Sequence, residues 1–140
     1  MPAEWVATTA GRHLSGRRKA DTAPELALRR ALHAAGGRFR LHVRLAKGCT
    51  PDLLLPSRRL AVFVDGCWWH SCPRHGRKTP FTGPNAGLWE EKMRRNQERD
   101  RASTRRAIEL GWQVVRVWEC DVLSNAACIA VDLLALPRRG

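Results

Sequence analysis

Residues 51–65 read PDLLLPSRRLAVFVD, and this stretch decides the fold. It contains two short apolar runs, 52–55 and 60–64, separated by Pro56-Ser57-Arg58-Arg59. Apolar runs of this length around a segment rich in turn residues predict two strands joined as a hairpin. Because Pro51-Asp52 opens the first strand, a carboxylate is expected at the edge of the sheet, facing a cleft.

The flanking sequence predicts helices and further strands around this hairpin. Asp21 or Thr22 can cap a helix that stops at Gly36-Gly37. The other expected elements are a strand over 39–44, a long polar helix over 88–110 capped by Gly111, a strand over 113–118, and a helix over 122–136 ended by Pro137. This order predicts an α/β sandwich with a mixed sheet flanked by helices. We expect one domain over 21–140, preceded by a basic arm over 1–20.

The charge of the chain indicates the kind of partner. Lys and Arg total 25 against 13 Asp and Glu, a formal net charge of +12 over 140 residues. Such an excess favours a polyanion, because each neutralised phosphate releases a counterion. General solubility and acidic lipid are the alternatives, but no basic amphipathic helix with a strongly apolar face supports lipid. No apolar run is long enough to span a membrane, and residues 1–19 lack a signal peptide's apolar centre, so we expect a cytoplasmic protein.

Five cysteines are an odd number, which argues against a disulfide framework and leaves metal binding or burial. Cys67, Cys72 and His75 lie close together in a loop rich in Gly and Pro, and Cys120 follows a predicted strand. This set suits a structural zinc ion, which prefers thiolate and imidazole ligands. His70 is the alternative to His75 as the fourth ligand. Cys49 and Cys128 are interpreted as core or incidental residues.

Acidic residues suggest a second metal. Asp52, with Glu25 from the first helix and a carbonyl at a strand end, offers the oxygen ligands that Mg²⁺ prefers. Each acid alone has a plainer explanation, Asp52 in a turn and Glu25 as a charge at a helix N-terminus. A common pattern of metal nucleases continues with an acid, a spacer and a lysine, and here it reads Asp65-Gly66-Cys67. A different general base is therefore required, such as a nearby histidine.

Several motifs together resemble the very short patch repair endonucleases. They are the runs 63–70 (FVDGCWWH) and 89–92 (WEEK), then Asn96, 98–100 (ERD), 111–112 (GW) and 117–120 (VWEC). The resemblance covers about residues 14–120. It implies a restriction-endonuclease-like fold with a structural zinc, and Mg²⁺-dependent nicking of duplex DNA 5′ of the thymine in T:G mismatches that arise from 5-methylcytosine deamination.

The resemblance also assigns roles to individual residues. Asp52 would bind Mg²⁺ together with the carbonyl of Val64, and His70 would be the general base. Glu25 would lie around these ligands or contact water held by the ion. The residues expected to contact DNA at or near the mismatch are Trp68, Trp69, Trp89, Lys92 and Asn96. We also expect a monomer, with other DNA repair proteins as candidate partners.

The chain departs from some members of that family. His70-Ser71-Cys72-Pro73-Arg74-His75 replaces a histidine-rich run, so the order of zinc ligands is shifted, and Asp65 stands at a position that can be histidine. Two other functions stay open: a zinc-containing DNA-binding module that does not cleave, and a related restriction or transposon nuclease with another target. A binding module has no use for Asp52 with His70.

Overall fold

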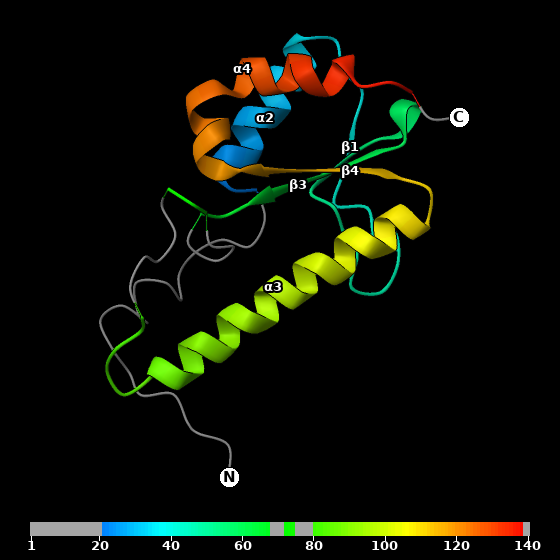
Figure 1. Cartoon of the computed structure of the whole chain (residues 1–140). Helices are drawn as coiled ribbons and strands as arrows, with labels where there is room; N and C mark the ends of the chain where they lie inside the picture. The colour runs from blue at the N-terminus through cyan, green and yellow to red at the C-terminus, as the bar shows by residue number, and fades with distance from the viewer. Residues whose placement is uncertain (1–20, 68–71, 75–79, 139–140) are drawn as a thin grey trace.

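The computed structural model describes residues 21–67, 72–74 and 80–138, which form a four-stranded sheet with helices on both faces (Figure 1). Helices α2 and α4 pack together on one face, and α3 crosses the other. The elements in chain order are α2 (Ala23–Ala34), β1 (Arg40–Leu41), β2 (Leu53–Leu55), the 3₁₀ turn η1 (Pro56–Arg58), β3 (Leu60–Asp65), α3 (Ala86–Glu109), β4 (Gln113–Trp118) and α4 (Glu119–Ala135).

The sheet has mixed strand directions, as predicted. Its order is β1-β2-β3-β4, with β1, β2 and β3 antiparallel in turn and β3 parallel to β4. The hairpin between β2 and β3 turns through η1 and Arg59, whose φ is 49°. Because β3 and β4 are parallel, their connection must cross the sheet, and α3 provides that crossover.

Two boundaries differ from the sequence-based expectation. The strand expected over 39–44 is only two residues long, β1, because His42 takes a φ of 48° and leaves the sheet. The last helix begins at Glu119 rather than at residue 122. Glu119 and Asp121 lie in its first turn, where carboxylates are favoured by the helix dipole.

The core lies on both faces of the β2–β3 hairpin. On the side of α2 and α4, one cluster includes Leu28, Leu53, Val62 and Val122. On the side of α3, a second cluster consists of Cys49, Leu54, Ala61, Phe63 and Ala107. Burial of both faces explains the continuous apolar run at 60–64, since an alternating pattern is expected only where one face meets water.

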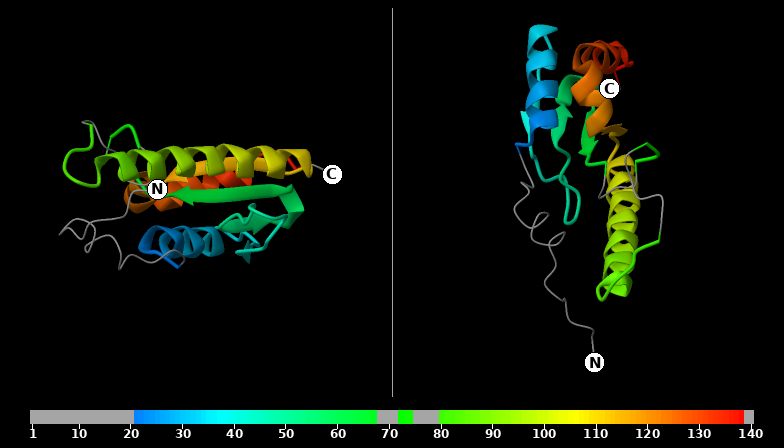
Figure 2. Two further views of the ribbon diagram at one scale, coloured as in Figure 1. Left: turned by 90° about the horizontal axis from the view of Figure 1, so that it is seen from below. Right: turned by 90° about the vertical axis from the view of Figure 1, so that its left-hand side faces the viewer.

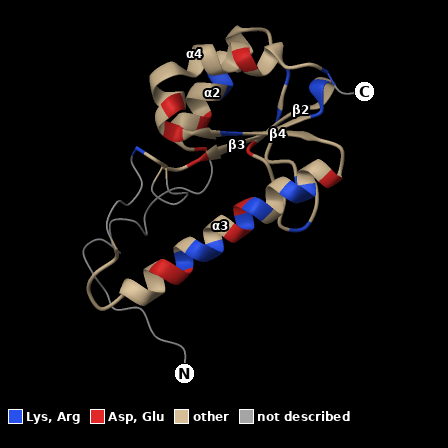
Figure 3. Cartoon of the chain, in the orientation of Figure 1, with Lys and Arg blue, Asp and Glu red and all other residues tan. Residues whose placement is uncertain are grey.

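Helix α3 extends well past the edge of the sheet (Figures 1 and 2). Its last turns are held by Ala107 in the core and by the carbonyl of Ser103, which accepts a hydrogen bond from the Cys49 thiol at 3.3 Å. Basic and acidic residues alternate along it (Figure 3). None of the helices in the described segments combines the length and the apolar composition that a bilayer span requires.

Candidate active site and metal centre

Asp52 lies immediately before β2, where its carboxylate reaches across to β3. Its Oδ2 accepts a hydrogen bond from the backbone N–H of Val64 at 2.7 Å. The hairpin therefore brings together the two residues that the family resemblance assigns as magnesium ligands. The bond also fixes the carboxylate against the end of β3, leaving little freedom for the Asp52 side chain.

Glu25 approaches Asp52 from the N-terminus of α2. A capping box orients it: the Thr22 N–H donates to Glu25 Oε2 at 2.9 Å, and the Glu25 N–H donates to Thr22 Oγ1 at 3.5 Å. Glu25 is only 3% exposed, although it carries a carboxylate. Local helix capping thus places a buried acid beside the start of β2.

The pKa of Asp52 is raised to about 8. Burial is the largest cause, followed by a side-chain hydrogen bond with Glu25, and the charges of Glu25 and Asp65 add to it. Near neutral pH, the Asp52 carboxyl is therefore largely protonated unless a positive charge is bound beside it. A divalent cation bound by oxygen ligands would supply that charge, so the donor set fits Mg²⁺.

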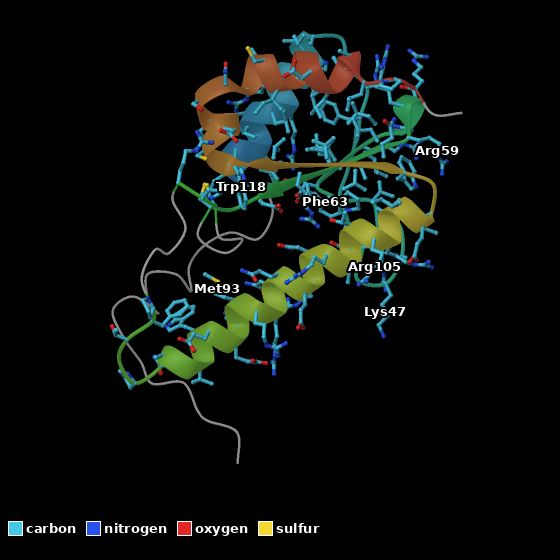
Figure 4. All side chains as sticks on the ribbon, viewed as in Figure 1. Lys47, Arg59, Phe63, Met93, Arg105 and Trp118 are labelled. Carbon is cyan, nitrogen blue, oxygen red and sulfur yellow. The ribbon has the colours of Figure 1, made fainter. Side chains whose placement is uncertain are left out.

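Asp65 is the third carboxylate near this site, and Arg116 of β4 holds it. Arg116 Nη1 lies 2.9 Å from Asp65 Oδ1, and the guanidinium lies 4.1 Å from the centre of the Phe63 ring. Figure 4 shows Phe63 projecting from the sheet toward α3. The remaining guanidinium hydrogens reach α3 through Asp100 O at 2.9 Å, Ser103 Oγ at 2.7 Å and Thr104 Oγ1 at 2.7 Å. Arg116 therefore joins β3, β4 and α3 beside the acidic site.

The sequence analysis did not single out Arg116. Its signal was a lone charged residue in the otherwise apolar run QVVRVW of the predicted strand. A charge in a half-buried strand favours a partner, and the acid that ends the preceding parallel strand was available. The pairing depends on the parallel register of β3 and β4, in which Phe63 lies opposite Arg116.

A second cluster of charged and polar side chains, Asp21, Arg29 and His42, lies beside Asp52, and the sequence analysis did not predict it either. His42 lies directly after β1, and its N–H contacts the carbonyl of Asp52 at 3.3 Å. Its ring Nε2 lies 3.1 Å from Arg29 Nη2, and the same Nη2 lies 2.6 Å from Asp21 Oδ1. Ligand atoms of Asp21, Glu25 and His42 all lie within 4.8 Å of one another. No sequence spacing indicated this group, because it joins a helix to the end of a strand.

Three of the four predicted zinc ligands meet at the end of β4. The sulfur atoms of Cys67, Cys72 and Cys120 lie within 4.8 Å of one another, and those of Cys72 and Cys120 are 3.8 Å apart. Figure 4 shows sulfur atoms beside Trp118, at the end of β4. The loop is shaped by the Cys67 N–H, which donates to Glu119 Oε1 at 2.9 Å, and by the Cys72 N–H, which donates to Cys67 O at 2.9 Å.

The chemistry of these thiols suits a soft cation. Burial is the main cause that raises the pKa of Cys67, to about 12, so this thiol is protonated without a metal. A zinc ion would bind the thiolate forms and close the group with a fourth ligand. Both candidates for that ligand, His70 and His75, lie outside the described residues. Cys49 is a buried core residue and Cys128 is exposed, which agrees with their interpretation as core or incidental residues.

The aromatic and polar residues expected to contact DNA divide into two groups. Trp89 stacks on Phe81 with ring centres 6.1 Å apart, and Lys92 Nζ lies 5.7 Å from the centre of the Trp89 ring. Trp89 and Lys92 therefore share a face of α3, on the part of the helix that extends past the sheet. Asn96 is half-buried one turn further on. Trp68 and Trp69 lie outside the described residues.

Some arginines of α3 have acidic partners on the same helix. Arg94 pairs with Glu91 and Glu98, and Arg95 pairs with Glu91. Such exposed pairs contribute little to stability. They leave a solvated helix face in which positive and negative charges alternate.

Similarity to a solved structure identifies the class of fold. The fold resembles a homing endonuclease I-Bth0305I catalytic domain, with a TM-score of 0.51 and 14% identity over 81% of this chain and 92% of that one. The likeness confirms the predicted restriction-endonuclease-like fold of a mixed sheet flanked by helices.

Sequence similarity gives the family. The chain belongs to the Vsr family of DNA mismatch endonucleases, whose profile matches residues 7–75. It is 44% identical to the type II nicking enzyme V.NaeI of Lentzea aerocolonigenes, over 88% of this chain and 75% of the relative. It is 39% identical to the DNA mismatch endonuclease Vsr of Escherichia coli K12, over 71% of this chain and 62% of the relative. The predictions of this family and of a nuclease enzyme are confirmed.

Proposed function

We propose that this endonuclease nicks double-stranded DNA on the 5′ side of the thymine in a T:G mismatch, with Mg²⁺ as cofactor. The observation that carries the proposal is the group of carboxyls around Asp52, in which Asp52 Oδ2 lies 2.7 Å from the Val64 nitrogen and Glu25 and Asp65 are buried. Membership of a mismatch endonuclease family supports the substrate. The mismatch is the product expected when 5-methylcytosine deaminates opposite guanine.

In this proposal, Asp52 and the carbonyl of Val64 hold the ion. Mg²⁺ bound by these residues would supply the positive charge that neutralises the phosphate and stabilises the departing oxygen. Glu25 orients Asp52 through their hydrogen bond, and Arg116 pairs with Asp65 beside them. His70 takes the proton from the attacking water, which histidine can do near neutral pH.

Recognition of the mismatch is proposed for aromatic residues at two places. Trp68 and Trp69 wedge into the base stack, and Trp89 braces the duplex with Lys92 and Asn96. Unstacking costs less at a mismatch than at a paired step, so insertion itself favours T:G over T:A. The position of Trp89 on the projecting part of α3, outside both core clusters, supports this role.

The remaining proposals concern zinc and cellular context. We propose a structural Zn²⁺ bound by Cys67, Cys72, Cys120 and His75, with His70 as the alternative ligand; the three sulfur atoms already lie together. The ion would pin the loop after β3 to the start of α4. We further propose a cytoplasmic monomer, in which residues 1–20 form a basic arm and 21–140 the endonuclease domain, and which works with other DNA repair proteins.

The decisive experiment is a nicking assay on two duplexes that differ only in T:G against T:A. Each strand carries its own label, and each reaction is run with Mg²⁺ or with EDTA. We expect one nick, 5′ of the mismatched thymine, in Mg²⁺ alone. Binding without cleavage would identify a DNA-binding module, and equal cleavage of both duplexes would identify a restriction-type nuclease.

A further inference from the structure

We propose that Arg29 and His42 form a binding site for a backbone phosphate of DNA, and that the Asp21 carboxylate occupies this site in the free protein. The inference rests on the proposed function for its ligand, a DNA strand. It adds a site beside the carboxyls of Asp52 and Glu25, built by α2 and by the residue that follows β1.

The geometry of Asp21 is that of an anion bound by a cationic site. Arg29 Nη2 lies 2.6 Å from Asp21 Oδ1, and His42 Nε2 lies 3.7 Å from the same oxygen. The Arg29 side chain is 14% exposed and that of His42 32%, whereas the Asp21 side chain is 58% exposed. The Arg29 guanidinium, which is the cation of this site, is therefore built into the domain, and its anionic occupant sits at the surface, where it can be displaced.

Two energetically unfavourable features indicate that this site serves a function. His42 is not a glycine, yet its φ is 48°, a left-handed conformation that costs about 1–3 kcal/mol. The Nε of Arg29 is buried and has no hydrogen-bond partner among the residues that the structure describes. A buried unsatisfied donor also destabilises the native state. Both features concentrate at binding and catalytic sites, where the surrounding fold maintains them.

The charge of the site selects an anion rather than a metal ion. Asp21, Glu25 and His42 alone would resemble a cation site. However, the Arg29 guanidinium lies within 3.1 Å of both the His42 ring nitrogen and the Asp21 carboxylate. A divalent cation placed there would be repelled by that guanidinium, whereas a phosphate would accept charge-assisted hydrogen bonds from it.

The location of the site suggests which phosphate it binds. Leu41 pairs with Leu53 in the antiparallel register of β1 and β2, so His42 lies opposite Asp52. A strand whose reacting phosphate lies at Asp52 can therefore place a neighbouring phosphate at His42 and Arg29. That contact would set the position of the backbone along the acidic site, which is needed for cleavage at one defined bond.

The test measures the binding of duplex DNA in EDTA by fluorescence anisotropy, over a range of salt concentrations. Arg29→Gln should weaken binding about tenfold and reduce the salt slope by about one. The matched control is Arg30→Gln, an exposed neighbour on α2 that loses the same charge. Asp21→Asn should tighten binding about threefold, because the competing anion is gone. Its control is Asp132→Asn on the exposed surface of α4.

A double variant and a second cation complete the design. Asp21→Asn should have no effect in the Arg29→Gln background, since the two residues act on one site. Equal salt slopes for Arg29→Gln and Arg30→Gln would overturn the proposal. Weaker DNA binding by Asp21→Asn in Ca²⁺ but not in EDTA would also overturn the proposal, because it would identify Asp21 as a metal ligand. If Arg29→Gln has a lowered melting temperature, the exposed Asp21→Asn variant still decides the outcome.

These results are separable from the nicking assay. Binding in EDTA involves no strand cleavage, so the phosphate site can be established even when T:G duplexes are not nicked. Conversely, normal T:G nicking combined with equal salt slopes for the two arginine variants would remove the phosphate site and leave the proposed function in place.

Discussion

Asp52→Asn should stabilise the metal-free protein at alkaline pH while it abolishes nicking. The carboxyl of Asp52 has a pKa of about 8 in the folded chain against a reference value of 3.8. Because the folded-state pKa lies above the unfolded value, folding favours the protonated form. The resulting stabilisation is complete below about pH 4 and is lost as the pH rises through about 8.

The magnitude follows from the same pKa difference. Between pH 5 and pH 8, ionisation of a carboxyl with these two pKa values removes about 4 kcal/mol from the free energy of unfolding. Rearrangement around the ionised Asp52 and entry of water raise the effective dielectric constant, so we expect about 2 kcal/mol. The amide of Asn can keep both contacts, accepting from the Val64 N–H and donating to Glu25, without acquiring a charge.

The assay is urea unfolding of the wild type and Asp52→Asn in EDTA at pH 5 and pH 8. The wild type should lose stability between these pH values relative to the variant, and at pH 8 the variant should be the more stable protein. Adding Mg²⁺ at about 100 times its Kd should stabilise the wild type by about 2.7 kcal/mol and the variant far less. Parallel pH dependence in the two proteins, or equal stabilisation by Mg²⁺, would refute the buried acidic site.

Three further substitutions test other parts of the molecule. Cys120→Ala should lower zinc content and melting temperature together, because metal binding is coupled to folding; stoichiometric zinc in the purified variant would exclude this residue from the site. Arg116→Met should lower the free energy of unfolding by about 3–5 kcal/mol, since it leaves Asp65 buried without its ion pair. Adding Asp65→Asn to this variant should recover part of that loss. Additive losses from the two substitutions would show that the ion pair is unimportant. Trp89→Ala should fold normally but lose the preference for T:G over T:A in the nicking assay; an unchanged preference in a folded variant would eliminate the proposed wedge.

Local sequence determined most of the secondary structure of this protein. The long helix, the hairpin and the strand at 113–118 were predicted because each carries its own signal: periodic polarity, a turn between apolar runs, or a short apolar run after a glycine. The family was equally accessible, because short motifs kept their order along the chain. Asp52 and Val64 lie together because a hairpin brings residues at its open end together by register alone, while their role as magnesium ligands stays a prediction.

Tertiary structure decided what occurs between elements that are distant in the chain. Arg116 meets Asp65 only because β3 and β4 are parallel, and parallel pairing leaves no turn motif in the sequence. Glu25 becomes an interacting partner of Asp52 only when α2 packs over β2, and burial then raises the pKa of Asp52. Asp21, Arg29 and His42 meet where a helix approaches a strand end. Such contacts depend on packing and on burial of charge, which no spacing along the chain encodes.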